Sequence, residues 1–336
     1  MTRQPRKAGS RHDVERLRLL AKVARMYYEQ GIRQPQIAAT LGMSQSRVSR
    51  SLKEAGRLGI VRTIVVPPSG VYGDVEDALR DRFGLRDVVV ADAPDESEAA
   101  ILRALGAAGA GYLESTLTGE DRIGISSWSS TLLATAEAMT PSTVRTAVEV
   151  VQIIGGVGKP SVQVRATQLA EQFARVTGAT PRFLAAPGVV TSRALRDALL
   201  ADPFIAELAR SWAGLSVALV GIGSVEPSPL LRESGNALAE PDLAALRELG
   251  GVGDVCLHFY DENGAALGSA LDERIVGISA DALRAVPRVI GIAGGPRKLK
   301  AIRGAVLGGW INTLITDLAT ARALLADDDP APAEVR

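Results

Sequence analysis

The 336-residue chain contains one cysteine, Cys256, and two histidines. A single cysteine excludes a disulfide within the chain and any metal site built from several cysteines. No apolar run reaches the roughly 18 uncharged residues that cross a bilayer, and the first residues, MTRQPRKAGSRHD, lack the apolar stretch of a signal peptide. These absences favour a cytoplasmic protein that uses neither a metal nor a cofactor and has no membrane partner.

Charge is balanced over the whole chain but is unevenly distributed along it. Residues 1–70 carry fourteen Lys and Arg against four acids, a net charge of +10, so the remaining residues carry −10. A basic head on an acidic body is the arrangement expected when one small domain meets nucleic-acid phosphates. The alternative interpretation is a basic N-terminal tail without a binding function.

Three helices are predicted in the head. Apolar residues recur at helical spacing over residues 14–30, and Gly31 ends that helix. A second short helix, 34–41, has Pro35 in its first turn, and Ser44 caps a third helix that continues to Gly59. The pattern is typical of a helix-turn-helix domain, and the alternative is a small solvated helical bundle.

The third predicted helix presents a polar outer face rich in side chains that reach base edges and phosphates. Double-stranded operator DNA is therefore the predicted partner of the head. Residues 60–66, IVRTIVV, are predicted to form a wing strand beside this helix. The predicted DNA-binding residues are Gln36, Ser44, Gln45, Ser46, Arg47, Ser49, Arg50 and Lys53.

A breaker cluster at residues 67–70, PPSG, predicts the boundary between head and body. Beyond it, near-continuous apolar strands alternate with amphipathic helices, which indicates an α/β domain with a mostly parallel sheet covered on both faces. The predicted strands are 86–92, 121–126, 147–155, 181–187, 215–223, 254–260 and 287–295. The predicted organisation is a disordered basic tail (1–12), a winged helix-turn-helix domain (13–68), an effector-binding and oligomerisation domain (69–326) and a disordered tail (327–336).

Four of the predicted strands are followed by loops rich in glycine or hydroxyl residues, at 126–131, 155–160, 221–224 and 294–298. Any one of these loops alone is more typical of a tight strand-to-helix turn, and none matches a P-loop or a dinucleotide fingerprint. Ligands of open α/β sheets bind beyond the carboxyl ends of the strands, so the four loops together predict a ligand pocket. Asp254 is a candidate partner for sugar hydroxyls there.

The ordered motifs QIAATLGMSQSRVSRSLKEAGRLGIV, GISSWSSTL, VVQIIGG, GIGS, GDVCLHFYDENG and VIGIAGGPRKLKAIRGAVLGGWINTLITD span nearly the whole chain. In this order they resemble the SorC family of bacterial sugar-binding transcriptional regulators. The resemblance implies a C-terminal domain similar in fold to sugar-phosphate isomerases, a phosphorylated sugar as effector, and assembly as a homodimer or homotetramer.

The resemblance also places the effector's phosphate on the first loop, with the hydroxyls of Ser127, Ser129, Ser130 and Thr131 as donors. Many members of the family have glycine at the position of Ser129. The resemblance and the four polar loops together predict a set of effector-binding residues. These are Ser126, Ser127, Trp128, Ser129, Ser130, Thr131, Gln152, Gly155, Gly156, Gly223, Asp254, Gly294, Gly295 and Lys298.

Two functions are compatible with these features. The first is a transcriptional regulator without enzymatic activity, whose operator affinity changes when a sugar phosphate binds and which controls a carbohydrate operon. The alternative is a sugar-phosphate isomerase or deaminase carrying a DNA-binding head. An isomerase needs a catalytic base. The chain has two histidines, but His12 lies in the basic tail and His258 lies in an apolar strand, so Asp254 is the candidate base.

Overall fold

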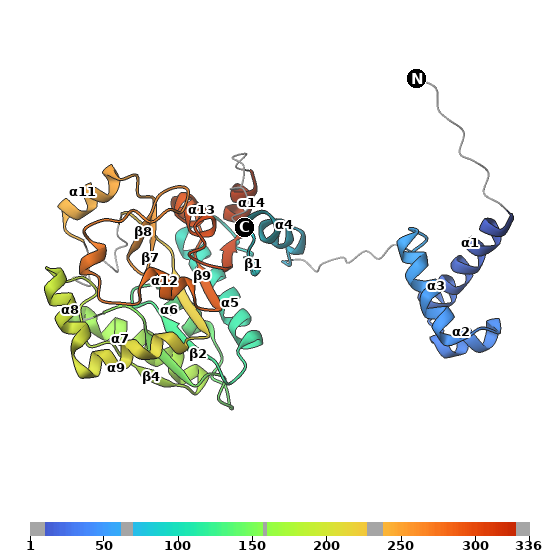
Figure 1. The fold of residues 1–336 in the computed structure, drawn as a ribbon, viewed down its shortest axis with the longest axis horizontal. Helices are drawn as coiled ribbons and strands as arrows, with labels where there is room; N and C mark the ends of the chain where they lie inside the picture. The colour runs from blue at the N-terminus through green and yellow to red at the C-terminus, as the bar shows by residue number, and fades with distance from the viewer. Residues whose placement is uncertain (1–10, 62–69, 157–159, 227–237, 327–336) are drawn as a thin grey trace, which may run out of the picture. The chain divides into compact units, whose positions relative to one another are not determined.

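The computed structural model describes residues 11–61, 70–156, 160–226 and 238–326 (Figure 1). The chain forms two compact units, Met1–Pro67 and Pro68–Arg336, whereas the sequence places the boundary after residue 68. Most of the predicted wing and of both predicted tails lies outside the described residues, although residues 11 and 12 are already helical. Within the described part, no helix is long and apolar enough to cross a membrane.

The head is a three-helix unit. Helix α1 (Arg11–Ala24) continues into a π-helical turn, η1 (Arg25–Glu29), and α2 (Gln34–Leu41) and α3 (Gln45–Arg57) follow. Gly31 and Gly42 have φ of 66° and 63°, the left-handed conformation that lets a helix stop without a Cβ clash. The three helices meet through an apolar cluster made of Val23, Met26, Ile37, Ala38, Val48 and Leu52. Leu20, Ala24 and Ala55 form a second, smaller cluster between α1 and α3.

The body is built on a seven-stranded sheet in which every strand pair is parallel. The strand order is β1-β10-β9-β5-β2-β3-β4, so strands far apart in sequence become neighbours. The strands are β1 (Asp87–Ala91), β2 (Arg122–Ile125), β3 (Glu149–Gln152), β4 (Thr180–Arg182), β5 (Val217–Gly221), β9 (Arg288–Ile292) and β10 (Thr313–Asp317). This confirms the predicted α/β class and the mostly parallel sheet.

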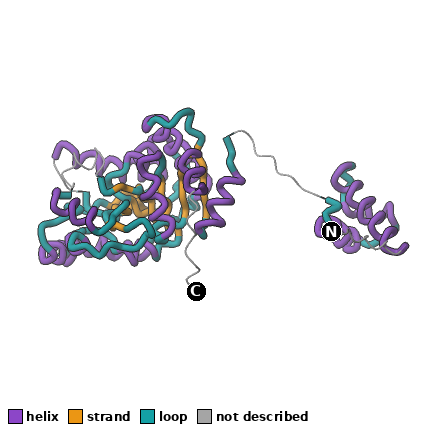
Figure 2. Tube along the Cα trace, turned by 90° about the horizontal axis from the view of Figure 1, so that it is seen from above, coloured by secondary structure: helices purple, strands orange, loops and turns teal. Residues whose placement is uncertain are grey.

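Helices cover both faces of the sheet, as Figure 2 shows with the strands lying between layers of helix. Successive strand residues enter opposite cores, because side chains alternate across a strand: Val150 packs with one cluster and Val151 with the other. One face holds α5 (Glu98–Thr116), α6 (Ser130–Ala138) and α7 (Pro160–Thr177). The other face holds α4 (Gly73–Phe83), α9 (Pro203–Ser211), α11 (Glu240–Glu248), α12 (Ala280–Arg284), α13 (Leu299–Leu307) and α14 (Leu318–Ala326).

The predicted strand 254–260 is wrong as a strand of the main sheet. The segment instead forms a hairpin, β7 (Gly253–Val255) and β8 (His258–Tyr260), which pairs antiparallel with β6 (Gly223–Ser224) in a separate sheet. Cys256 and Leu257 make the two-residue turn with φ of 53° and 64°. A turn with both central residues at positive φ matches the twist of a hairpin, although glycine or asparagine is the usual occupant.

Two further elements differ from the prediction. The amphipathic segment 192–204, whose pattern predicts one helix, forms two helices, α8 (Arg193–Ala201) and α9. Pro203 begins the second helix, and Asp202 caps it by accepting hydrogen bonds from the N–H groups of Phe204 and Ile205. Strand β10 was not predicted, since its polar sequence TLITD does not look like a buried strand. The 3-10 turns are η2 (Trp212–Gly214), η3 (Asp272–Arg274) and η4 (Pro296–Lys298).

Candidate functional site

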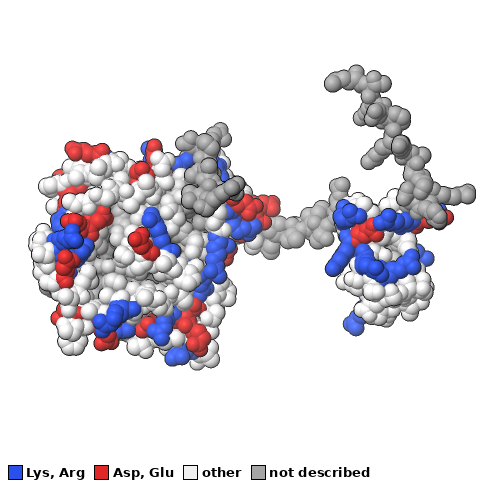
Figure 3. All heavy atoms as spheres, in the orientation of Figure 1, with Lys and Arg blue, Asp and Glu red and all other residues white. Residues whose placement is uncertain are grey.

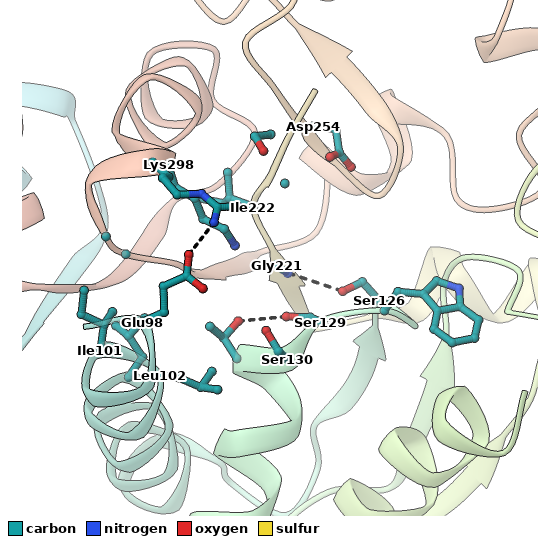
Figure 4. A pocket seen from close by; sticks show the side chains of 18 of the residues that line it. Glu98, Ile101, Leu102, Ser126, Ser129, Ser130, Gly221, Ile222, Asp254 and Lys298 are labelled. Atoms are coloured by element: carbon teal, nitrogen blue, oxygen red, sulfur yellow. Dashed lines mark hydrogen bonds and ion pairs between the residues drawn. The ribbon is translucent and has the colours of Figure 1, made fainter. Parts of the chain in front are cut away.

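A cavity of about 320 Å³ lies at the carboxyl ends of the central strands. Three of the four predicted loops reach it, following β2, β5 and β9, which are adjacent in the sheet. The hairpin that follows β6 adds a fourth wall, and Figure 4 shows Ser126, Ser130, Asp254 and Lys298 around the same space. Eleven predicted residues line it: Ser126, Ser127, Trp128, Ser129, Ser130, Thr131, Gly223, Asp254, Gly294, Gly295 and Lys298.

Most hydroxyls of the first loop already have partners inside the protein. Ser127 Oγ donates to the carbonyl oxygen of Ile154 at 2.8 Å, and Thr131 Oγ1 donates to that of Ile292 at 2.9 Å. Ser129 Oγ lies 2.9 Å from Thr131 Oγ1 and accepts a hydrogen bond from Leu132 N, so it caps helix α6. These three side chains therefore hold the loop against the neighbouring strands.

Ser130 is the member of the loop that is free to bind a ligand. Its side chain is exposed, and its hydroxyl has no hydrogen-bonding partner in the described part of the chain. Ser130 is also the first residue of α6, and the first N–H groups of a helix have no partner within the helix. A hydroxyl beside such N–H groups is suited to an anion, because the helix dipole adds positive potential there.

Asp254 enters the cavity from β7, opposite the first loop. Its carboxylate occupies the position of a side chain on Gly223, where a Cβ would overlap Oδ1. Burial raises the pKa of Asp254 to about 6, although the N–H of Leu257, 3.0 Å away, and the charge of Lys298 oppose the shift. The group is therefore placed to titrate near neutral pH.

The positive charge of the cavity comes from Arg297 and Lys298 in η4. Burial lowers the pKa of the half-buried Lys298, and the negative charge of Asp254 works in the opposite direction. Arg297 Nη1 instead donates to Glu98 Oε1, 2.6 Å away at the start of α5. Both cations therefore interact with carboxylates of the same chain.

The glycine pair before η4 is fixed from the neighbouring strand. Gly295, with φ of 90°, donates its N–H to Asp317 Oδ2 at 2.8 Å, and a Cβ on Gly294 would overlap the same carboxylate. Asp317 is buried and also accepts hydrogen bonds from the N–H and hydroxyl of Thr320. The unpredicted strand β10 thus sets the backbone that carries both cations.

Three predicted residues, Gln152, Gly155 and Gly156, do not line the cavity. Gln152 is buried, and its Oε1 accepts a hydrogen bond from Leu184 N, which ties β3 to the segment after β4. A Cβ on Gly155 would overlap the backbone of Pro187, so this glycine permits two chain segments to cross. Strand β3 lies one position further from the centre of the sheet than β2, and of the described residues that follow β3, Ile154 alone reaches the cavity.

The apolar wall and part of the rim of the cavity were not predicted. Ile101 and Leu102 are adjacent in α5, and Leu105 lies one helical turn further on. The helical period indicates that the three side chains share a face, although not that this face borders a ligand. The indole N–H of Trp128 is buried without a partner among the described residues. Six other lining residues lie outside the predicted loops and residue set: Glu96, Glu98, Ile154, Glu226, Cys256 and Leu257. Five more belong to the predicted loops but were not named as effector-binding residues: Gly221, Ile222, Ser224, Pro296 and Arg297.

His258 does not line the cavity, although it directly follows Leu257, which does. Its ring stacks on Trp310, its Nε2 lies 2.9 Å from the carbonyl oxygen of Ile278, and burial lowers its pKa. The geometry matches a neutral structural histidine between the hairpin and the following segment.

The head carries the second candidate site, on α3. Ser44 caps this helix by accepting a hydrogen bond from Arg47 N, and Val48, Leu52 and Ala55 face the core. Lys and Arg side chains gather on the visible face of this unit in Figure 3. The predicted DNA-binding residues are all exposed except Ser49, which is half-buried: Gln36, Ser44, Gln45, Ser46, Arg47, Arg50 and Lys53.

Comparison with known proteins identifies relatives along most of the chain. The family model "Sugar-bind: Putative sugar-binding domain" matches residues 72–326. The deoxyribonucleoside regulator of Bacillus subtilis is 33% identical over 94% of this chain and 99% of its own, and the sorbitol operon regulator of Klebsiella pneumoniae is 32% identical over 92% and 98%. The crystal structure of the full-length sorbitol operon regulator SorC from Klebsiella pneumoniae superposes with a TM-score of 0.71 and 31% identity, covering 92% of this chain and 98% of that one.

Proposed function

The chain belongs to the SorC family of transcriptional regulators, and we propose that it binds operator DNA through α3 with an affinity that a phosphorylated sugar controls. The observation that carries this proposal is the joint presence of an exposed basic helix face in the head and a cavity in the body that is lined by the exposed Ser130 at the start of α6. A ligand changes DNA affinity only through different affinities for two arrangements of the protein.

On the DNA side, Gln45, Arg47 and Arg50 would contact base edges and phosphates in the major groove. Two or more copies of α3 would meet repeated half-sites in a homodimer or homotetramer, and the regulator would act in the cytoplasm, where its operator lies. Relatives named for sorbitol and deoxyribonucleosides support a carbohydrate operon as the target.

On the effector side, the phosphate would bind at the start of α6, held by the Ser130 hydroxyl, the free N–H groups and Lys298. Asp254 would accept hydrogen bonds from sugar hydroxyls, because its carboxylate faces the same cavity. In this proposal Ser127, Ser129 and Thr131 position the loop rather than bind the ligand.

The test begins with a duplex selected by the full-length protein from random DNA. In an electrophoretic shift at fixed salt, Arg50→Ala should weaken binding at least tenfold. Arg25→Ala removes the same charge from an exposed arginine outside α3 and is the matched control. Binding by Arg50→Ala equal to wild type would disprove the role of α3.

The effector arm uses the same duplex with a panel of pentose and hexose phosphates. One of these should change DNA affinity of the wild type, and Lys298→Ala should retain DNA binding but lose the response. Turnover of any panel member would instead support the isomerase or deaminase alternative.

A further inference from the structure

Glu98 and Arg297 form an ion pair on the wall of the cavity, although they lie 199 residues apart in the sequence. Glu98 is the first residue of α5, and Arg297 lies in η4 beside Lys298. Figure 4 shows Glu98 directed toward the segment that carries Lys298. The negative charge of Glu98 also acts on Lys298, opposing the lowering of its pKa by burial.

This ion pair can open at little cost to folding. The side chains of Arg297 and Glu98 are 74% and 80% exposed. Exposed ion pairs contribute little to stability, because water solvates both charges when the pair separates. Helix α5 does not depend on it either, since Ser97 caps the helix by accepting a hydrogen bond from Ala100 N.

The charges lining the cavity disfavour an anionic ligand as long as the pair is closed. Among the described residues, Glu96, Glu98, Glu226 and Asp254 line the same space as two cations, Arg297 and Lys298. Arg247 lies 2.6 Å from Glu226, which leaves three acids against these two cations. A guanidinium binds a phosphate through two parallel hydrogen bonds, and one already bonded to a carboxylate has fewer donors to offer. A phosphate that binds Arg297 must therefore compete with Glu98 for the N–H donors of the guanidinium.

We infer that Glu98 determines ligand selectivity by competing with the anionic group of the effector for Arg297. This inference rests on the proposed function for the identity of the effector, but the competition itself concerns any phosphate in the cavity. Ligands without an anionic group do not compete with Glu98 for Arg297, so the carboxylate weakens the binding of charged sugars alone and lowers the preference of the cavity for charged over neutral sugars.

The test compares full-length wild type with Glu98→Gln, which retains the size of the side chain and removes its charge. Titration calorimetry with inorganic phosphate and with the sugar-phosphate panel should show about two- to tenfold tighter binding for the variant at low salt. The gain should shrink in 0.5 M NaCl, because exposed charges are screened. Glu96→Gln removes a second lining carboxylate that has no ion pair among the described residues, and it should give a clearly smaller gain.

A double variant separates competition from a general change of charge. Glu98→Gln should give no gain in an Arg297→Ala background, because the contested group is absent. An equal gain in that background, or an equal gain from Glu96→Gln, would overturn the inference, as would unchanged binding by Glu98→Gln. Equal binding of a sugar phosphate by wild type and Glu98→Gln would refute the competition and leave the proposed function intact. Tighter binding of inorganic phosphate with no response to any sugar phosphate would support the competition and refute the proposed effector.

Discussion

The carboxylate of Asp254 occupies the space that a side chain on Gly223 would need. The two residues pair across β6 and β7, so the absent side chain on one strand allows an acid on the other to enter the cavity. Gly223 also lines the cavity, so the absence of a side chain at this position determines where the Asp254 carboxylate lies in the cavity.

Gly223→Ala should therefore move Asp254 and weaken ligand binding. We expect a loss of about 1–3 kcal/mol in the free energy of unfolding, measured by urea denaturation, because the added methyl group is forced into a filled space. The loss should become much smaller in an Asp254→Ala background, where the overlapping carboxylate is gone. A full loss in that background would show that the clash lies elsewhere.

Asp254→Asn should stabilise the protein in a pH-dependent manner. The folded-state pKa of about 6 lies above the unfolded value, so wild type loses stability as pH rises from about 4 to 6 and stays destabilised above that range. Two pKa units correspond to at most about 3 kcal/mol. The unfolding free energy of Asp254→Asn should exceed that of wild type at pH 8, and the difference should vanish below pH 4. A constant difference between pH 4 and 8 would contradict the raised pKa.

Ser130→Ala and Ser129→Ala should differ in their effects on stability and on ligand affinity. Ser130 has an exposed hydroxyl without a partner among the described residues, so its loss should leave the free energy of unfolding within about 0.5 kcal/mol of wild type. It should weaken phosphate-ligand binding by about 10- to 150-fold, since a hydrogen bond to a charged group contributes about 1.5–3 kcal/mol. Ser129 caps α6, and its removal should cost about 1 kcal/mol of stability. Thermal unfolding and ligand titration of both variants distinguish them, and a stability loss from Ser130→Ala alone would reverse the assignment.

Gly308→Ala should destabilise the body by about 1–3 kcal/mol. A Cβ on Gly308 would overlap the carbonyl oxygen of Gly264 and lie 2.7 Å from Trp310 Nε1, and these two atoms form a hydrogen bond of 2.9 Å. Gly111→Ala is the matched control, because Gly111 lies within α5 with nothing near its Cβ position and alanine favours a helix. Urea denaturation should therefore rank Gly111→Ala at or above wild type and Gly308→Ala below it.

Local sequence was sufficient to predict the helices of the head. Their apolar spacing, the cap at Ser44 and the glycines that end them act within one or two turns, and all three helices form where they were predicted. The main strands were readable for a similar reason, because strands buried on both faces are continuous apolar runs. Strand β10 was missed because its buried Asp317 and Thr316 look polar, although Asp317 is satisfied by hydrogen bonds from other segments.

The sequence by itself determined the charge difference between a basic head and an acidic body, the α/β class, and the presence of polar loops after the strands. Only the tertiary structure decided which loops meet, because strand order places β2, β5 and β9 side by side and leaves β3 and its glycines outside the cavity. It also decided which hydroxyls are free, since the partners of Ser127 and Thr131 are carbonyl groups 27 and 161 residues away in the chain. Glu98 became a candidate for the same reason: its partner is 199 residues away, beyond the reach of any local pattern.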